Sequence, residues 1–336
     1  MSGNLFAHAL LGLLPVCCFL AALVYLDSYK LVSIRGVLGI IVLGGATAGL
    51  SYLIHITLLD VLQMQLSSYT RYISPPIEES LKAVIIVFLI RHNRIGFLVD
   101  AAIFGFAVGT GFAMIENLYF LQILPDSHIA VWIVRGFGTA LMHGGATAIF
   151  AVVSYALLGR KSTAGSIVLL PGLAVATITH SVFNHFFLTP VLNTIVVIVF
   201  LPMLLSVVFR QSEKSLVDWL DMGFDADTEL LHLINSGEFS NSKTGLYLQS
   251  LKEKFRGEVV ADLLCYLRLH VELSIRAKGL LMMRDSGFDN KTGEETRAKL
   301  EEMKFLEGSI GATGKLAIKP FLKMSRKDLW QFYMLT

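Results

Sequence analysis

The sequence predicts an all-α protein, a polytopic bundle of about seven transmembrane helices followed by a small helical cytoplasmic C-terminal domain. Three observations lead to this fold class. Hydrophobic residues make up 54% of the chain and charged residues only 16%, with a mean hydropathy of +0.64, which soluble globular domains seldom reach. Apolar stretches of membrane-spanning length recur along the first 210 residues. The charged residues are concentrated after that point.

This uneven charge divides the chain into two expected domains. Residues 1–210 contain 10 of the 28 Lys and Arg residues and 7 of the 26 Asp and Glu residues, which leaves 18 and 19 for residues 211–336. We therefore expect a transmembrane domain over 1–210 and a soluble helical domain over 211–336. The net charge of +2 indicates no nucleic-acid partner. The three cysteines, Cys17, Cys18 and Cys265, form neither a disulfide framework nor a CxxC site.

A helix needs about 20 mainly apolar residues to cross a lipid bilayer. Seven stretches meet this length, some with polar interruptions: 5–26, 36–60, 74–90, 97–121, 130–158, 164–188 and 191–209. The first has no basic residue before its apolar run and no clear cleavage site, so we interpret it as a span and not as a signal peptide.

Basic residues set the expected orientation of these spans. They follow spans one, three, five and seven, as Lys30, Arg35, Arg91, Arg94, Arg160, Lys161, Arg210 and Lys214. The other connections contain only Arg71. Because cytoplasmic loops are enriched in Lys and Arg, we expect the N-terminus outside and the soluble tail in the cytoplasm.

Charged side chains within apolar spans are costly and require a reason. The third span opens with two prolines, Pro75 and Pro76, followed by Glu78, Glu79 and Lys82. The prolines indicate a helix start. Glu78 and Lys82 are one helical turn apart and can pair. An acid pair that simply caps a helix at the membrane interface is the structural alternative for this segment alone.

Later spans carry further polar groups. Glu116 and Asn117 end the fourth span, and the fifth contains Arg135 and His143. In the sixth, His180 and Asn184 are four residues apart and share one helix face.

The predicted depth of these groups brings them together. With the orientation above, the acids of span three, Glu116, and the His180–Asn184 pair all lie in the outer half of the membrane, with His143 somewhat deeper. Structural polar residues have no reason to agree in depth, so we expect one shared polar cavity. Asp100, near the cytoplasmic end of span four, lies outside it.

Such a cavity can carry out hydrolysis. Cleaving a peptide bond in a membrane needs a base that activates water and donors that stabilise an oxyanion. Carboxylates and imidazoles supply the base, and a histidine with an asparagine on one face supplies the donors. No span contains GxSxG, a catalytic Ser/Lys pair or HExxH, the signatures of serine and ordinary zinc-helix chemistry.

Over about residues 70–190 these motifs resemble those of the PrsW membrane proteases, within the wider group of CAAX prenyl endopeptidases and bacteriocin-processing proteins. The EExxK motif runs from Glu78 to Lys82, and the HxxxN motif from His180 to Asn184. Glu116-Asn117 and His143 stand between them on successive spans. The chain departs from the wider group at Thr139, where an aromatic residue is usual four positions before the first catalytic histidine; Phe137 is nearby.

The resemblance implies roles for these residues. Glu78 would be the water-activating base, assisted by His143. Glu79 and Lys82 would position it, and His180 with Asn184 would form the oxyanion site. It also implies a prokaryotic cytoplasmic membrane and cleavage of a membrane-anchored protein, such as a signalling regulator, near the extracytoplasmic side.

Two questions stay open at this stage. Glu78, His143 and His180 could hold Zn²⁺ with an open position, but we prefer a mechanism that requires no cofactor, because Asn184 suits oxyanion donation better than ligation. The alternatives to a protease are a proton- or ion-coupled transporter, which would need acids at several depths, and a non-catalytic membrane scaffold.

The tail shows helix-like apolar spacing at 216–223 and 246–284, with Gly, Asn, Ser and Asp residues between. We expect a small helical module there, without a catalytic cluster and with no partner indicated.

Overall fold

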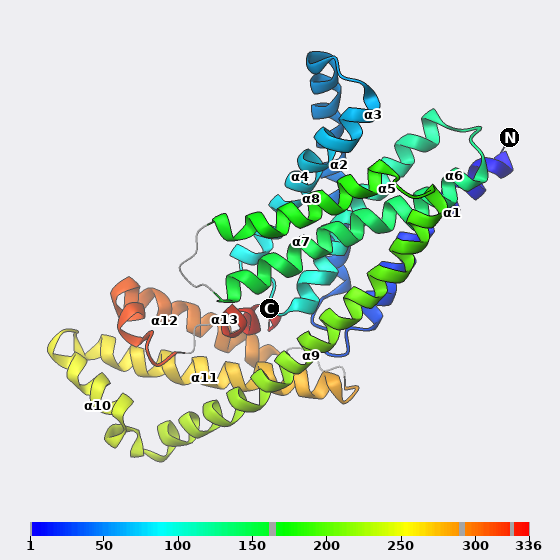
Figure 1. The fold of residues 1–336 in the computed structure, drawn as a ribbon. Coiled ribbons are helices and arrows are strands. Elements are labelled where there is room, and N and C mark those ends of the chain that lie inside the picture. The colour runs from blue at the N-terminus through cyan, green and yellow to red at the C-terminus, as the bar shows by residue number, and fades with distance from the viewer. Residues whose placement is uncertain (1, 161–165, 289–292, 323–325, 336) are drawn as a thin grey trace. The chain divides into compact units, whose positions relative to one another are not determined.

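The computed structural model describes residues 2–160, 166–288, 293–322 and 326–335, which form helices and no strand (Figure 1). The predicted all-α fold is confirmed. Contacts between Cα atoms divide the chain into two compact units, residues 1–213 and 214–336. Of the basic residues that set the expected orientation, Lys161 lies outside the described residues.

The first unit contains the predicted spans. Among the described residues six helical segments are long and apolar enough to cross a membrane: 5–25, 34–62, 98–123, 129–158, 167–185 and 190–236. The helices of this unit are α1 (Ser2–Tyr25), α2 (Ile34–Leu62), α3 (Leu66–Ser68), η1 (Tyr69–Ile73), α4 (Ser74–Arg91), α5 (Leu98–Ile123), α6 (Ile129–Ile133), η2 (Val134–Ala140), α7 (Leu141–Arg160), η3 (Ser166–Leu169), α8 (Leu170–His185) and the first part of α9 (Pro190–Ser236).

The third predicted span, α4, differs from the other six. It is a helix of 18 residues that carries Glu78, Glu79, Lys82 and Arg91, so it is less apolar than the rest. Its first three charged residues are buried, and the helix contacts α2, α5, α7 and α8. The charges are therefore enclosed by neighbouring helices and not exposed to lipid.

Helix α5 is the centre of this unit, and glycines allow its neighbours to approach closely. A methyl group on Gly111 would stand 1.9 Å from the carbonyl oxygen of Ile41 in α2, and one on Gly109 would stand 2.3 Å from that of His143 in α7. Small residues bring helix backbones together in the absence of water. This packing fixes α7, and with it His143, against α5.

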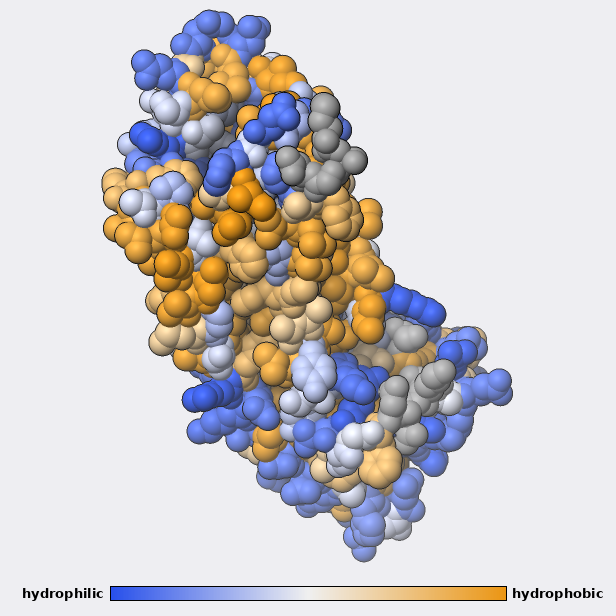
Figure 2. Space-filling model, turned by 90° about the vertical axis from the view of Figure 1, so that its right-hand side faces the viewer, coloured by the Kyte–Doolittle hydropathy of each residue, from blue (hydrophilic) through white to orange (hydrophobic). Residues whose placement is uncertain are grey.

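The surface of the first unit is apolar, as a membrane protein requires. Figure 2 shows hydrophobic side chains over its face. Phe6, Val42 and Phe200 are examples of large apolar side chains that are well exposed on α1, α2 and α9. Such a continuous apolar surface would be a liability in water, whereas lipid chains solvate it without cost.

The second unit comprises the last part of α9, η4 (Glu238–Asn241), α10 (Lys243–Ser250), η5 (Leu251–Glu253), α11 (Gly257–Asp285), α12 (Glu294–Ile318) and α13 (Arg326–Met334). Its core includes Leu263, Leu267 and Leu273 of α11. The predicted helix at 246–284 is thus divided into α10, η5 and α11. The predicted helix at 216–223 is continuous with the seventh span as α9.

A buried polar cluster lies beside that core. Lys278 of α11 donates hydrogen bonds to Asp227 and Ser274, and both of its partners are largely buried. Burial lowers the pKa of the neighbouring His270 to about 4, so this imidazole is neutral at pH 7. The ion pair leaves no net charge in the interior.

The close approach of α2 to α5 can be tested at Gly44. Replacing Gly44 by alanine is expected to destabilise the first unit by about 1–3 kcal/mol, because the new methyl group would stand 2.1 Å from the Val108 carbonyl oxygen. Thermal unfolding in detergent micelles measures the change.

Gly49, in the same helix, is the matched control. A methyl group there meets no described atom within 4 Å, so Gly49→Ala should not destabilise, since alanine is the better helix former. Equal melting temperatures for the two variants would show that the α2–α5 contact is not tight.

Candidate active site

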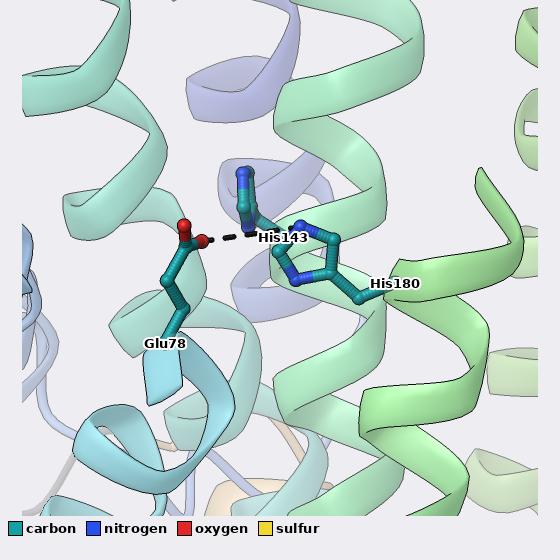
Figure 3. A group of neighbouring side chains, drawn as sticks. All are labelled: Glu78, His143 and His180. Atoms are coloured by element: carbon teal, nitrogen blue, oxygen red, sulfur yellow. Dashed lines mark ion pairs between the residues drawn. The ribbon is translucent and has the colours of Figure 1, made fainter. Parts of the chain in front are cut away.

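Three buried side chains from three helices converge in the first unit: Glu78 of α4, His143 of α7 and His180 of α8. One carboxylate oxygen and one nitrogen of each imidazole lie within 4.8 Å of one another. Figure 3 shows the three side chains turned toward one space. Glu78 Oε2 lies 3.9 Å from His180 Nε2. We refer to these three residues as the trio.

The local fold explains why the Glu78 side chain lies at the same depth as the two histidines. Pro75 and Pro76 stand at the start of α4, where the missing backbone N–H groups cost nothing. The preceding π-helical turn, η1, is held by α8: Ser181 Oγ donates to the Arg71 carbonyl at 2.6 Å, and the Asn184 amide donates to the Thr70 carbonyl at 2.9 Å. The end of α8 therefore fixes the start of α4.

A buried ion pair within α4 lies beside the trio and contacts its histidines. Lys82 Nζ donates to Glu79 Oε1 at 2.6 Å and to His143 Nδ1 at 3.1 Å, and it is completely buried. Lysine can only donate, so His143 Nδ1 accepts. The pairing of Lys82 with Glu78 that the spacing allows is not formed: the lysine faces α7, while Glu78 faces α2 and α8.

Hydrogen bonds also fix the protonated nitrogen on each histidine. Since Nδ1 of His143 accepts, its Nε2 carries the proton and donates to Glu116 Oε2 at 3.0 Å. His180 Nδ1 lies 2.9 Å from Glu79 Oε1. A carboxylate can only accept, so this nitrogen donates. The lone pair of His180 Nε2 is left facing Glu78.

Glu116 and Asn117 have different surroundings although they are adjacent in α5. Glu116 is 28% exposed, the most accessible carboxylate of the group, and pairs with Arg135 at 3.4 Å. Asn117 donates to the Gly12 carbonyl of α1 at 2.7 Å and accepts from Arg135 Nε at 2.8 Å. Asn117 thus lies behind Arg135, with its described hydrogen bonds made outside the trio.

The other predicted residues are placed as follows. Glu79 and Lys82 contact the trio directly, as described above. The described contact of the Asn184 amide is with the backbone of η1. Asp100 accepts from the backbone N–H groups of Gly96 and Phe97 at the start of α5. It therefore caps a helix, as expected for a residue outside the cluster.

His55, which none of the sequence motifs indicated, also binds Glu78. Its Nε2 lies 3.2 Å from Glu78 Oε1, and its Nδ1 lies 2.7 Å from the Tyr69 hydroxyl. The carboxylate can only accept, so Nε2–H donates to it, and Nδ1 accepts from the Tyr69 hydroxyl. Ser74 also donates to Glu78. A histidine within the apolar stretch 36–60 was the available signal, because an imidazole at that depth is costly.

No motif indicated Phe112 either. Its ring lies 5.0 Å from the His143 ring and 4.4 Å from the Lys82 ammonium. It packs beside His143 from α5. In the wider group an aromatic residue precedes this histidine by four positions, where this chain has Thr139. Here the aromatic ring beside the imidazole comes from a different helix, α5.

The trio fits a zinc ion by the chemistry of its donors. Two imidazoles and one carboxylate are a common set in hydrolytic zinc sites. A histidine that binds zinc usually donates its other ring N–H to a carboxylate. Here His180 donates to Glu79, and His143 donates to Glu116. Lys82 donates a hydrogen bond to His143 Nδ1, the nitrogen that would bind the zinc ion. Zinc binding there therefore requires the ammonium to shift toward Glu79.

Comparison with known proteins adds one finding. A family model described as PrsW family intramembrane metalloprotease matches residues 32–208, which is more than half of the chain and includes every residue of the trio. No curated protein and no solved structure matches the chain.

The buried ion pair can be tested by removing one partner. Lys82→Met leaves the Glu79 carboxylate buried without its ammonium, and this should cost about 3–5 kcal/mol in unfolding free energy. A lower melting temperature in detergent and a lower level in membranes are expected. The double variant Lys82→Met/Glu79→Gln removes both charges and should recover most of the loss. A single variant as stable as the wild type would contradict this account.

Proposed function

Because the chain belongs to the PrsW family of intramembrane metalloproteases, we propose that the trio is the active site of an intramembrane endopeptidase. The coarse statement is established by the family: the chain is a multi-pass membrane peptidase whose substrates are membrane-anchored proteins. The observation that carries the proposal is the convergence of Glu78, His143 and His180 from separate helices, each bonded to further carboxylates, imidazoles or hydroxyls.

Glu78 is the proposed proton acceptor. Its carboxylate is 11% exposed and is oriented by two donors to Oε1, Ser74 and His55. When a water oxygen forms a bond to the peptide carbonyl carbon, the proton of that water passes to the carboxylate, and from there to the departing amine. Glu79 cannot take this role as readily, since it accepts from both Lys82 and His180 and is almost completely buried.

We also propose that the trio binds zinc. When bound, the ion would lower the pKa of a water molecule and polarise the peptide carbonyl. The sequence favoured a mechanism without a cofactor because of Asn184, but the described hydrogen bond of that amide goes to Thr70. The carboxylates on the outer nitrogens of both histidines support the zinc-binding interpretation.

Glu79, Lys82 and Asn184 are proposed as positioning residues. Lys82 joins Glu79 to His143, and Glu79 in turn fixes His180. Asn184 holds η1, the segment from which α4 begins. These contacts orient the trio without taking part in proton transfer.

The site of cleavage follows from topology. Glu116 lies near the end of α5 and His180 near the end of α8, so the trio is close to the side of the membrane at which these helices end. The positive-inside rule assigns that side to the exterior. We therefore propose cleavage near the extracytoplasmic face of the prokaryotic cytoplasmic membrane, with the C-terminal unit in the cytoplasm and a membrane-anchored signalling regulator as substrate.

The proposal predicts the behaviour of Glu78→Gln. The change keeps the side-chain shape and removes the base, so cleavage should fall by roughly 10²- to 10⁴-fold, while abundance stays the same. The measurement compares membrane-anchored fragments in cells with the wild type and the variant by mass spectrometry. A precursor should accumulate in the variant, and the fragment ends should place the cut near the extracytoplasmic face.

Glu258→Gln is the matched control, because Glu258 is an exposed residue in the first turn of α11. It should process the same precursor as fast as the wild type. If no membrane protein differs between wild type and Glu78→Gln, the proposed activity is wrong. A cut on the cytoplasmic side would refute only the proposed orientation.

Zinc binding gives a second prediction. Protein purified in detergent should contain stoichiometric zinc by elemental analysis, and His143→Ala and His180→Ala should each lose most of it, since a ligand is removed. His270→Ala, which alters an imidazole of the second unit, should retain the metal. A protein that cleaves its substrate after removal of all zinc would restore the interpretation without a cofactor.

A further inference from the structure

Arg135 stands at the edge of the trio with a hydrogen-bond donor to spare. Its side chain is 13% exposed, and its Nη2 is shielded from solvent without a hydrogen-bond partner among the described residues. This Nη2 is ion-paired with Glu116 Oε1 at 3.4 Å but does not form a hydrogen bond to it. A buried donor without a hydrogen bond costs free energy, so Nη2 can accommodate a further oxygen atom.

The guanidinium is held rigidly in this place. Its Nε donates to Asn117 Oδ1 at 2.8 Å, and its plane lies over the Phe120 ring at 3.6 Å. Asn117 is fixed in turn by the Gly12 carbonyl of α1. Arg135 belongs to η2, the π-helical turn that leads into α7, and such turns often occur at functional sites. A fixed donor binds a developing charge without reorganising first.

Peptide hydrolysis needs such a donor at the carbonyl oxygen, and the other cationic and amide groups of the site are committed elsewhere. Lys82 is wholly buried and donates to Glu79 and His143. Asn184 donates to the backbone of η1. Arg135 reaches the trio through Glu116, which accepts from His143 Nε2.

We propose that Arg135 is a catalytic residue that binds the scissile carbonyl oxygen; this rests on the proposed function. As the water oxygen bonds to the carbonyl carbon, the π electron pair moves onto the carbonyl oxygen. The guanidinium donates a hydrogen bond to that oxyanion and keeps all of its protons, because it remains charged at every working pH. When the carbon–nitrogen bond breaks, the electron pair returns and the hydrogen bond weakens. Asn117 is a positioning residue for Arg135.

Kinetics of Arg135 variants test the assignment. The probe is the membrane-anchored protein that accumulates with Glu78→Gln, made as a purified reporter. Removing one oxyanion donor lowers kcat by roughly 10²- to 10³-fold, so Arg135→Gln should show such a loss with little change in KM. Arg135→Lys keeps the charge but not the fork of donors and should also lose kcat. Added guanidinium ion should restore part of the activity of Arg135→Ala, which a purely structural role would not allow.

Arg71→Gln is the matched control, since the recorded contact of Arg71 with α8 uses its backbone carbonyl and not its side chain. It should cleave like the wild type. If Glu78→Gln is inactive while Arg135→Gln cleaves normally, the Arg135 assignment is wrong and the proposed function stands. If Glu78→Gln cleaves normally, the proposed function itself fails.

A binding experiment needs no substrate. Phenylphosphonate carries a tetrahedral oxyanion, and with zinc removed by a chelator it should raise the melting temperature of the wild type in detergent. The shift should persist in Arg71→Gln and disappear in Arg135→Gln. A shift that is the same in all three proteins, or absent from the wild type, would overturn the assignment.

Discussion

The buried ion pair between Lys82 and Glu79 is the interaction on which the site depends. Each of these charges would be prohibitively costly alone in an apolar interior. Paired at 2.6 Å, the two charges neutralise each other, and each then orients one histidine of the trio. Lys82 donates a hydrogen bond to His143 Nδ1, and Glu79 accepts one from His180 Nδ1. The orientation of both imidazoles therefore follows from one salt bridge.

The helix packing makes such a polar cluster possible within lipid. Glycines at 44, 109 and 111 bring α2 and α7 against α5, so that the cluster is enclosed by protein on nearly every side. Glu116 is its most accessible side chain at 28% exposed, followed by His55 at 17% and Arg135 at 13%. Glu116 and Arg135 therefore lie at an edge of the cluster that is partly open.

Of the residues predicted as one cluster from their depth, Glu78, Glu79, Glu116, His143 and His180 do meet in the structure. The depth of a residue in the membrane depends on its position along a helix, which can be counted in the sequence. The partner of each side chain depends on how the helices are rotated about their axes, which cannot be read from the sequence. For that reason the partner of Lys82 is not the one that spacing suggested, the amide of Asn184 proved to bind the backbone of η1, and His55, Phe112 and Arg135 acquired roles in the site that no motif indicated.

Composition and hydropathy determined by themselves that this chain is an all-α membrane protein with a polar C-terminal unit, because continuous apolar stretches of about 20 residues cross a bilayer as helices. They also determined which polar side chains had to share a depth. Only the tertiary structure decided which nitrogen of each histidine carries the proton, which carboxylate each cation binds, and that α9 runs without a break from the last span into the tail. These depend on the rotation and close approach of helices, which contacts between distant residues fix and local sequence does not.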